Sequence, residues 1–362
     1  MLISHLSLTN FRSYKELNLE LSGGNNIFVG ENGEGKTNIV ESIIYLSLLE
    51  SHRVATDQPL ISLGQERAYI RAQAKNDERE QLIELEINPN RANRAQINKQ
   101  PVRSQREILG LVNTTHFSPE DLDLVRGDPS ERRRFLDHLL IQESPRYSAV
   151  ISDYERVVKQ RNSLLKSHAS QQSLEPWNQH LLDFGSEVVS GRLRLLERLH
   201  PHLTDAYRRI SPKKEFSVEY RSSTQGLSHE KEANKERLSE RLFEVRDVER
   251  DRGVTLIGPH RDDLDLKLDD TLVKGFASHG ESWSVALALK LSSYLLLLNQ
   301  GKKPILILDD VFSELDLSRR EQLTDLAGSA DQTLITVAVQ NDLPRNLEGV
   351  HFTVKDGKAI RR

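Results

Sequence analysis

Hydrophobic and polar residues alternate along the first part of the chain, with leucines two positions apart at 6–8 and again at 17–21. This period of two is typical of half-buried β-strands. The same pattern predicts strands at 69–74, 82–87 and 94–97, and an apolar run predicts a short buried strand at 27–29. Glycine-rich or polar turns are expected at 23–24, 75–78 and 98–100.

The pattern becomes mostly helical near Pro119 and stays so to about Arg252. Helices are predicted at 129–141, 146–166, 175–199 and 231–248, with a lone strand at 216–220. Further along, strands are expected at 264–268, 305–308 and 334–339, and helices at 281–299 and 319–326. We predict an α/β domain formed by the two chain ends, 1–118 and 253–362, which a helical insertion at 119–252 interrupts.

A glycine-rich segment lies between the strand predicted at 27–29 and a helix with apolar residues on one face. It matches the phosphate-loop pattern G-x-x-x-x-G-K-[ST] at every fixed position. In such a loop, backbone N–H groups and the helix N-terminus bind phosphate oxygens, the lysine neutralises the β and γ phosphates, and the threonine ligates Mg²⁺. A simple turn with a solvated lysine is the alternative, which the flanking strand and helix disfavour. The predicted nucleotide-binding residues are Gly30, Glu31, Asn32, Gly33, Glu34, Gly35, Lys36, Thr37 and Asn38.

A second candidate site follows the apolar strand at 305–308. Asp309 is expected to hold Mg²⁺ together with Thr37, and Asp310 to orient or deprotonate an attacking water. We therefore predict Asp310 and Lys36 as the catalytic residues. The alternative is that the two aspartates cap the helix that follows, since acidic residues favour that place. The phosphate loop upstream favours the metal interpretation.

A third candidate, Ser278 with Gly280, opens the helix predicted at 281–299. A serine, a glycine and a helix N-terminus together can bind an anion. Ordinary helix capping is the alternative, and taken alone it is favoured. The position of this segment, about 30 residues before Asp309, favours the anion site.

The order of these motifs resembles that of ABC-type ATPases, in which the SELD segment at 313–316 also has its place. More narrowly, the chain resembles the RecF family of bacterial recombination-repair ATPases, which is related to SMC proteins. The most specific segments are FSPED at 117–121 and GPHRDD at 258–263. The matching segments span nearly the whole chain: 8–14, 30–38, 117–122, 132–137, 154–156 with 160–162, 258–264 and 308–316.

This resemblance implies an ABC-type ATPase head with mixed sheets and a helical lobe, which binds ATP with Mg²⁺ and hydrolyses it weakly, stimulated by DNA. It implies a head-to-tail homodimer in which Ser278 and Gly280 contact the γ-phosphate of the partner chain and Asp316 lies at the seam. The dimer would close on double-stranded or gapped DNA in DNA repair, replication and the SOS response, and would help RecR and RecO to load RecA. Arg12 is expected near the nucleotide, and 117–121 where the nucleotide couples to the helical lobe.

Two departures from other ABC ATPases qualify these expectations. Many of them have Glu where this chain has Asp310, whose shorter side chain predicts slow turnover, although RecF-like chains share it. The strand at 334–339 is followed by Gln340 and Asn341 instead of a histidine that senses the γ-phosphate. That switch is therefore absent or differently built.

The net charge of the chain limits the kind of surface with which it could bind DNA. Lys and Arg number 50 against 54 Asp and Glu, a net charge of −4, which excludes a globally basic protein and leaves a local patch. Between Arg126 and Lys214 there are 16 basic and 11 acidic residues. Nine basic residues there could bind phosphates as a stripe, although solvated helix faces have the same pattern. They are Arg132, Arg133, Arg134, Arg156, Lys159, Arg161, Lys166, Arg192 and Arg194.

Composition excludes several classes of site and protein. The chain has no cysteine, so disulfides, cysteine-zinc sites and cysteine nucleophiles are excluded. Unbroken apolar runs are far shorter than the ~20 residues of a membrane span, and no targeting segment is visible. We therefore expect a cytoplasmic protein without a membrane partner.

Three other functions were weighed against the sequence. A transporter motor subunit would have a shorter chain, a Leu-Ser-Gly-Gly-Gln signature and the switch histidine. An SMC-type cohesion protein needs hundreds of heptad residues, but only about 130 are available in the insertion, interrupted by Pro176, Pro201 and Pro212. An ATPase-linked nuclease needs more than the roughly 20 residues that follow Val339.

Overall fold

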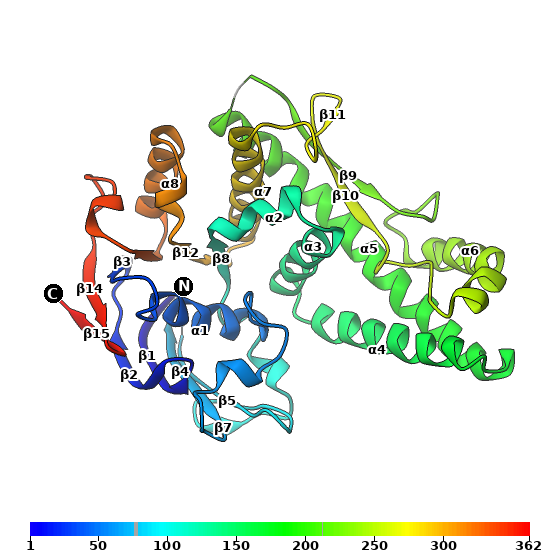
Figure 1. Ribbon diagram of the computed structural model, residues 1–362, viewed down its shortest axis with the longest axis horizontal. Coiled ribbons are helices and arrows are strands. Elements are labelled where there is room, and N and C mark those ends of the chain that lie inside the picture. The colour runs from blue at the N-terminus through cyan, green and yellow to red at the C-terminus, as the bar shows by residue number, and fades with distance from the viewer. Residues whose placement is uncertain (76–78, 212) are drawn as a thin grey trace. The chain divides into compact units, whose positions relative to one another are not determined.

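The computed structural model describes residues 1–75, 79–211 and 213–362 (Figure 1). Most of the turn expected at 75–78, and Pro212, lie outside these residues. The chain divides into two compact units, a head unit of Met1–Asp121 with Leu287–Arg362 and an inserted unit of Leu122–Ala286. The head unit therefore contains both chain ends. Its second part begins later than the boundary drawn at residue 253, because β10 (Asp263–Leu268) pairs antiparallel with β9 (Phe216–Arg221) inside the inserted unit.

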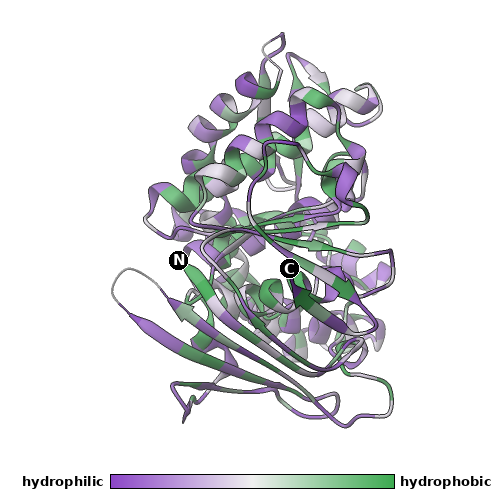
Figure 2. Cartoon of the chain, turned by 90° about the vertical axis from the view of Figure 1, so that its left-hand side faces the viewer, coloured by the Kyte–Doolittle hydropathy of each residue, from purple (hydrophilic) through white to green (hydrophobic). Residues whose placement is uncertain are grey.

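One sheet of the head unit is antiparallel, with the strand order β2-β1-β4-β5-β6-β7. Hydrophobic and hydrophilic residues are interleaved along its strands (Figure 2), as the alternating pattern predicts. Leu6 and Leu8 are fully buried on its inner face. The strands are β1 (Leu2–Phe11), β2 (Tyr14–Glu20), β4 (Ala68–Lys75), β5 (Glu80–Ile87), β6 (Arg94–Ile97) and β7 (Gln100–Pro101).

The second sheet of the head unit carries the candidate site. Its strand order is β15-β14-β3-β13-β12-β8, and all neighbours are parallel except the edge pair β14 and β15. Parallel strands place their carboxyl ends along one edge, which is where α/β proteins bind ligands. The strands are β3 (Gly24–Val29), β8 (Thr114–Phe117), β12 (Ile305–Asp309), β13 (Gln332–Val337), β14 (Val350–Lys355) and β15 (Lys358–Arg361).

Helix α1 (Lys36–Leu48) is buried along most of its length. Its apolar residues Ile39, Val40 and Ile43 form one core cluster with residues of both sheets. This burial fixes the end of the helix where the glycine-rich loop enters it. The remaining short elements of the head unit are η1 (Gln58–Leu60), η2 (Gln105–Ile108), η3 (Pro119–Asp121), η4 (Val311–Glu314), α8 (Leu317–Ser329) and η5 (Gln340–Asp342).

The inserted unit is mostly helical, as predicted, with a small sheet in the order β11-β10-β9. Its α5 spans 40 residues, which is longer than the helix predicted at 175–199, and it runs through Pro176 and Pro201. Leu181, Leu182 and Val188 of this helix are buried in the core of the unit, and that packing offsets the bonds the prolines cannot make. The elements are α2 (Leu122–Arg126), α3 (Pro129–Glu143), α4 (Tyr147–Lys166), α5 (Gln171–Ile210), α6 (Lys231–Arg252) and β11 (Thr271–Leu272).

Helix α7 (His279–Asn299) crosses from the inserted unit into the head unit along the chain. It is long and apolar enough to cross a membrane by length and composition, which the search for unbroken apolar runs did not detect. However, 72% of its most apolar window is buried inside the protein. The core helix of a soluble protein has the same property, so this helix is weak evidence for a membrane span.

Candidate functional site

The glycine-rich loop joins β3 to α1 and bends through two left-handed glycines, Gly33 at φ 91° and Gly35 at φ 102°. A side chain at Gly35 would also meet the Tyr14 hydroxyl at 2.9 Å. The Tyr14 hydroxyl donates a hydrogen bond to the Gly35 carbonyl, 3.1 Å away, and so holds the loop where the helix begins. The backbone therefore requires glycine at this position.

Lys36 is 3% exposed, and its ammonium group points back into the loop. It donates to the carbonyl oxygens of Gly30, at 2.8 Å, and Glu31, at 3.2 Å. The same ammonium lies 3.9 Å from a carboxylate oxygen of Asp310. The loop thus holds the buried positive charge of Lys36 at the position where the sequence predicts phosphate binding.

Asp309 ends β12 and is 5% exposed. Its Oδ1 accepts hydrogen bonds from the hydroxyls of Thr37, at 3.2 Å, and Thr336. The pKa of Asp309 is raised to about 6, chiefly by burial and also by the charge of Asp310, while the hydrogen bond from Thr336 opposes this rise. A divalent cation would favour the carboxylate, and Mg²⁺ prefers oxygen ligands such as these. The donor set of Thr37 and Asp309 therefore fits Mg²⁺.

Asp310 has a left-handed backbone, with φ 50°, and its N–H donates to the Thr336 carbonyl at 3.2 Å. Its side chain is 34% exposed, and burial raises its pKa while the charge of Lys36 lowers it. Asp310 occupies the N-cap position of η4, but its side chain makes no capping hydrogen bond there. The N-cap of α8 is Asp316, which accepts from the Arg319 N–H at 3.0 Å. The capping interpretation of the aspartate pair is thus not supported.

Thr336 is a site residue that the sequence analysis missed. It lies on β13 opposite Asp309 in the parallel register, and it contacts both aspartates. The available signal was a hydroxyl residue inside the otherwise apolar run at 334–339. Only the register of β12 against β13 indicates which residue that hydroxyl meets.

A buried carboxylate, Glu41, anchors two arginines beside the phosphate loop. The guanidinium of Arg12 donates to both carboxylate oxygens, at 2.8 and 2.5 Å, and Arg53 lies 3.5 Å away. Hydrogen bonds from Arg12 and Ser51 hold the pKa of Glu41 below its usual value, against the effect of burial. Arg12 is therefore fixed by Glu41 near the loop, and its approach to a nucleotide stays a prediction.

Ser278 is the N-cap residue of α7 in the inserted unit. Its hydroxyl accepts from the Glu281 N–H at 3.2 Å, and its own N–H donates to Glu281 at 2.9 Å, a reciprocal capping box. Lys214 donates to Glu281 at 2.7 Å and lowers its pKa to about 2. The contacts are thus those of ordinary capping, and the contact of Ser278 with a γ-phosphate stays a prediction.

The predicted basic stripe is wrong for three of its nine members. Arg132, Arg161 and Arg192 are buried, and their side chains are 5%, 3% and 4% exposed. They form ion pairs inside the inserted unit with Asp263 at 2.7 Å, Glu249 at 2.6 Å and Asp137 at 2.7 Å, respectively. These arginines stabilise the fold and are not available to DNA.

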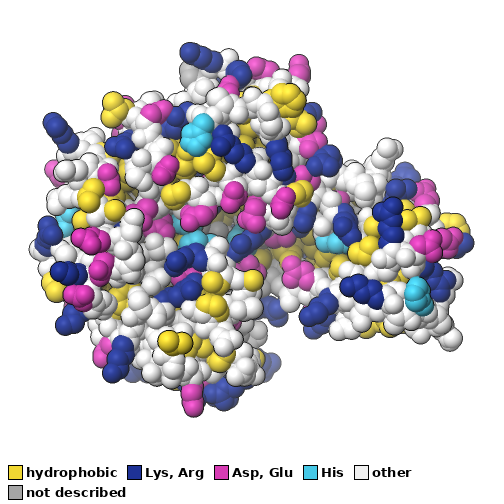
Figure 3. Space-filling model, in the orientation of Figure 1, with side chains coloured by type: hydrophobic (Ala, Val, Ile, Leu, Met, Phe, Trp, Pro, Cys, Tyr) yellow, Lys and Arg dark blue, Asp and Glu magenta, His cyan; other side chains and the backbone are white. Residues whose placement is uncertain are grey.

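Exposed basic residues do exist on α4, at Arg156, Lys159 and Lys166. On the face drawn in Figure 3, Lys and Arg side chains are interspersed with Asp and Glu side chains. Arg156, for example, pairs with Asp153 one turn away. The surface charges therefore indicate local contacts with phosphates at most.

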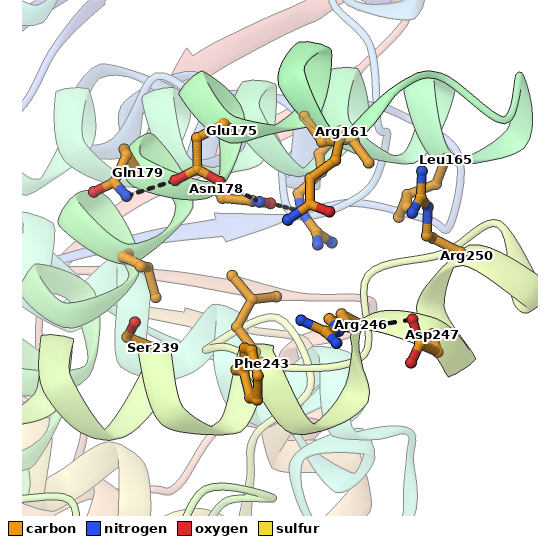
Figure 4. Close-up of a pocket in the computed structure, with 14 residues that line it drawn as sticks. Arg161, Leu165, Glu175, Asn178, Gln179, Ser239, Phe243, Arg246, Asp247 and Arg250 are labelled. Carbon is orange, nitrogen blue, oxygen red and sulfur yellow. Dashed lines mark hydrogen bonds and ion pairs between the residues drawn. The ribbon is translucent and has the colours of Figure 1, made fainter.

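A cavity of about 440 Å³ lies among α4, α5 and α6 of the inserted unit (Figure 4). The exposed Phe243 lies at it, and Arg161 reaches it from α4. Arg161 donates to Asn178 at 2.8 Å, and Arg246 lies 3.7 Å from Asp247. Both of these cations have acidic or amide partners, whereas Arg250, which also lines the cavity, donates to the Ala169 carbonyl at 3.3 Å.

The chain is similar to known proteins over almost its whole length. The family model for the RecF/RecN/SMC N terminal domain matches residues 2–358. The DNA replication and repair protein RecF of Streptomyces avermitilis is 50% identical, and the alignment covers 100% of both chains. The chain belongs to the RecF family. RecF of Kineococcus radiotolerans is 46% identical, again over 100% of each chain.

Solved structures agree with this family. A structure of the recombination mediator protein RecF-ATPrS in the RecFOR pathway has a TM-score of 0.91 at 29% identity. It covers 99% of this chain and 98% of that one. An SMC head bound to the C-winged helix domain of ScpA has a TM-score of 0.58 at 16% identity, covers 100% of this chain and 98% of that one, and shows the fold alone. The predicted α/β class and the resemblance to RecF are thus confirmed.

Proposed function

We propose that this RecF-family chain is an ATP-dependent DNA-binding switch of DNA replication and repair. The observation that carries the proposal is the convergence of the phosphate loop with the end of β12, where the Thr37 hydroxyl lies 3.2 Å from Asp309. Relatives in the same family supply the context, since a solved RecF is described with ATP in the RecFOR pathway.

Each site residue has a role in this proposal. The backbone of residues 30–38 and the buried ammonium of Lys36 bind the phosphates, and Thr37 with Asp309 holds Mg²⁺. Asp310 lies 3.9 Å from Lys36 and orients the attacking water as a base. Its shorter reach compared with Glu favours weak hydrolysis, which suits a switch more than a motor.

The switch itself is a homodimer. Ser278 and Gly280 begin α7, where a helix N-terminus can bind an anion, and they contact the γ-phosphate on the partner chain. ATP closes two chains on double-stranded or gapped DNA, hydrolysis releases it, and the complex helps RecR and RecO to load RecA. DNA binding then uses exposed basic residues such as Lys159 and Lys166, not the buried arginines of the same segment.

A paired experiment tests this function. Lys36→Ala removes a charge-assisted contact of about 1.5–3 kcal/mol, so MgATP affinity in calorimetry should fall roughly tenfold or more. Lys15→Ala, at an exposed position on β2, is the control. Ser278→Arg should bind ATP normally but lose ATP-dependent dimers in light scattering, with exposed Ser239→Arg as its control.

Two results would contradict the proposal. Unchanged MgATP affinity in Lys36→Ala would show that residues 30–38 are not the phosphate-binding loop. Normal ATP-dependent dimers in Ser278→Arg would show that Ser278 does not contact the nucleotide of the partner chain. Loss of ATP binding in that variant would mean that Ser278 acts on the nucleotide bound by its own chain.

A further inference from the structure

Two histidines that the proposed function does not use lie beside Asp309. His52, His116 and Asp309 each bring one potential ligand atom to within 4.8 Å of the other two. The imidazole rings of His52 and His116 are themselves in contact, with centroids 4.6 Å apart. Two imidazoles and a carboxylate therefore meet in one small volume of the head unit.

The sheet register explains how His116 reaches Asp309. β8 pairs in parallel with β12, and His116 lies opposite Ile307. Because side chains two positions apart point to the same face of a strand, Asp309 points to the same face as Ile307 and His116. That face is the one toward α1, since Thr114 of β8 contacts Ser47 at 2.7 Å.

His52 is brought to the same place by the segment that follows α1. Its neighbour Ser51 donates to Glu41 of α1 at 2.6 Å, and the N–H of Arg53 donates to the Ser51 hydroxyl at 3.0 Å. The backbone on both sides of His52 is thus tied to the helix. Elements from three distant parts of the sequence position the three side chains.

The two histidines each have a buried nitrogen that the protein does not satisfy. Nδ1 of His52 and Nε2 of His116 are buried, and among the described residues neither has a hydrogen-bond partner. An unsatisfied buried polar atom is destabilising, so two of them on histidines that meet beside Asp309 indicate a ligand for these side chains. Burial also lowers the pKa of His52 to about 4, and that of His116 well below its usual value, which keeps both imidazoles neutral.

We propose that His52, His116 and Asp309 bind a transition-metal ion of the zinc class, at a position next to the predicted magnesium site. Neutral imidazole nitrogens are ligands for Zn²⁺ and its neighbours, whereas Mg²⁺ prefers oxygen. Tetrahedral zinc ligands lie about 3.3 Å apart, so the three side chains close in on the ion by small rotations. Two cations near the histidines have carboxylate partners, Lys290 with Asp121 at 2.9 Å and Arg53 with Glu41 at 3.5 Å, and this pairing limits their repulsion of the ion.

The metal has a regulatory consequence, which rests on the proposed function. Zn²⁺ and Mg²⁺ would both use the Asp309 carboxylate, and two divalent cations held that close repel each other, so zinc-class metal and MgATP compete. Because coupling between two ligands is reciprocal, MgATP should weaken metal binding by the factor by which the metal weakens MgATP binding.

The test measures metal binding on the full chain without a tag, after treatment with EDTA and without nucleotide. Co²⁺ is the probe, because its visible absorption reports bound metal, and Zn²⁺ is the competitor. Wild type should bind one Co²⁺ per chain, and Zn²⁺ should displace it. His52→Asn and His116→Gln keep a polar side chain of similar size, and each should weaken binding at least tenfold. His200→Gln, at an exposed position on α5, is the matched control and should bind as wild type does.

A second readout separates loss of the site from loss of the fold. Zn²⁺ should raise the melting temperature of wild type and of His200→Gln, but not of the two site variants, while all four melt alike in EDTA. Equal Co²⁺ affinity in wild type and both site variants, or no stoichiometric binding to wild type, would overturn the proposal. If wild type binds MgATP but no Co²⁺, the metal site fails alone, and if it binds Co²⁺ but no MgATP, the proposed function fails alone.

Discussion

Arg161 provides a sharp test of which basic residues stabilise the inserted unit. Its guanidinium donates to Glu249 at 2.6 Å, to Asn178 at 2.8 Å and to Thr255 at 2.9 Å. These partners lie on α6, on α5 and in the segment after α6, so one side chain of α4 joins three other parts of the unit. We predict that Arg161→Met destabilises the protein strongly.

The size of the stability loss follows from the unpaired Glu249 carboxylate that the substitution leaves in the core. Glu249 is fully buried, at 0% exposure, and Arg161 is 3% exposed. Removing one partner of a buried ion pair costs about 3–5 kcal/mol, because the other charge stays uncompensated. For a unit of this size each kcal/mol lowers the melting temperature by about 2–4 °C, so a fall of roughly 10 °C is expected. Replacing both partners, in Arg161→Met with Glu249→Leu, should recover most of this loss.

The assay is urea and thermal unfolding followed by circular dichroism. Lys159→Met, two residues earlier on the same helix and exposed, is the matched control and should change stability by less than about 0.5 kcal/mol. The reasoning is refuted if Arg161→Met is as stable as Lys159→Met, or if the double variant is no more stable than Arg161→Met. Either result would mean that the ion pair does not form in solution.

Three further predictions concern the head unit. Asp310→Asn should keep MgATP affinity but release phosphate more slowly than wild type; an unchanged rate would assign the water to another group. Because burial raises the pKa of Asp309 to about 6 from a usual 3.8, the native state binds more protons between these values. Without Mg²⁺, stability should therefore fall as pH rises from about 4 to 6, by about 3 kcal/mol, and urea titrations should show that Asp309→Asn lacks this slope. Gly35→Ala, at φ 102° and with its added carbon 2.8 Å from the Ser13 hydroxyl, should lose about 1–3 kcal/mol in the same titrations; full stability would mean that the loop relaxes freely.

The sequence alone determined the features that depend on residues close together in the chain. The phosphate loop is eight consecutive residues with a strand before it and a helix after it, and two of its glycines, Gly33 and Gly35, have a left-handed backbone that favours glycine. Alternation and helical spacing likewise predicted most strands and helices, because one buried face imposes its period locally. The family resemblance followed from segments of the same kind.

The tertiary structure decided what depends on distant partners. Arg161 and Lys159 are both basic residues of one helix. Arg161 stabilises the fold because it pairs with Glu249, a carboxylate 88 residues away in the sequence. Forty-one residues lie between the end of β9 and the start of β10, yet the pairing of these strands places both in the inserted unit.

The histidines beside Asp309 are also a feature that only the tertiary structure decided. Nothing near His52 or His116 in the sequence signals a ligand, because their nearness arises from the register of β8 against β12 and from the burial of α1. Local patterns determine which elements form. Burial, register and ion pairing are properties of the assembled core, and they decide what each polar residue in those elements can do.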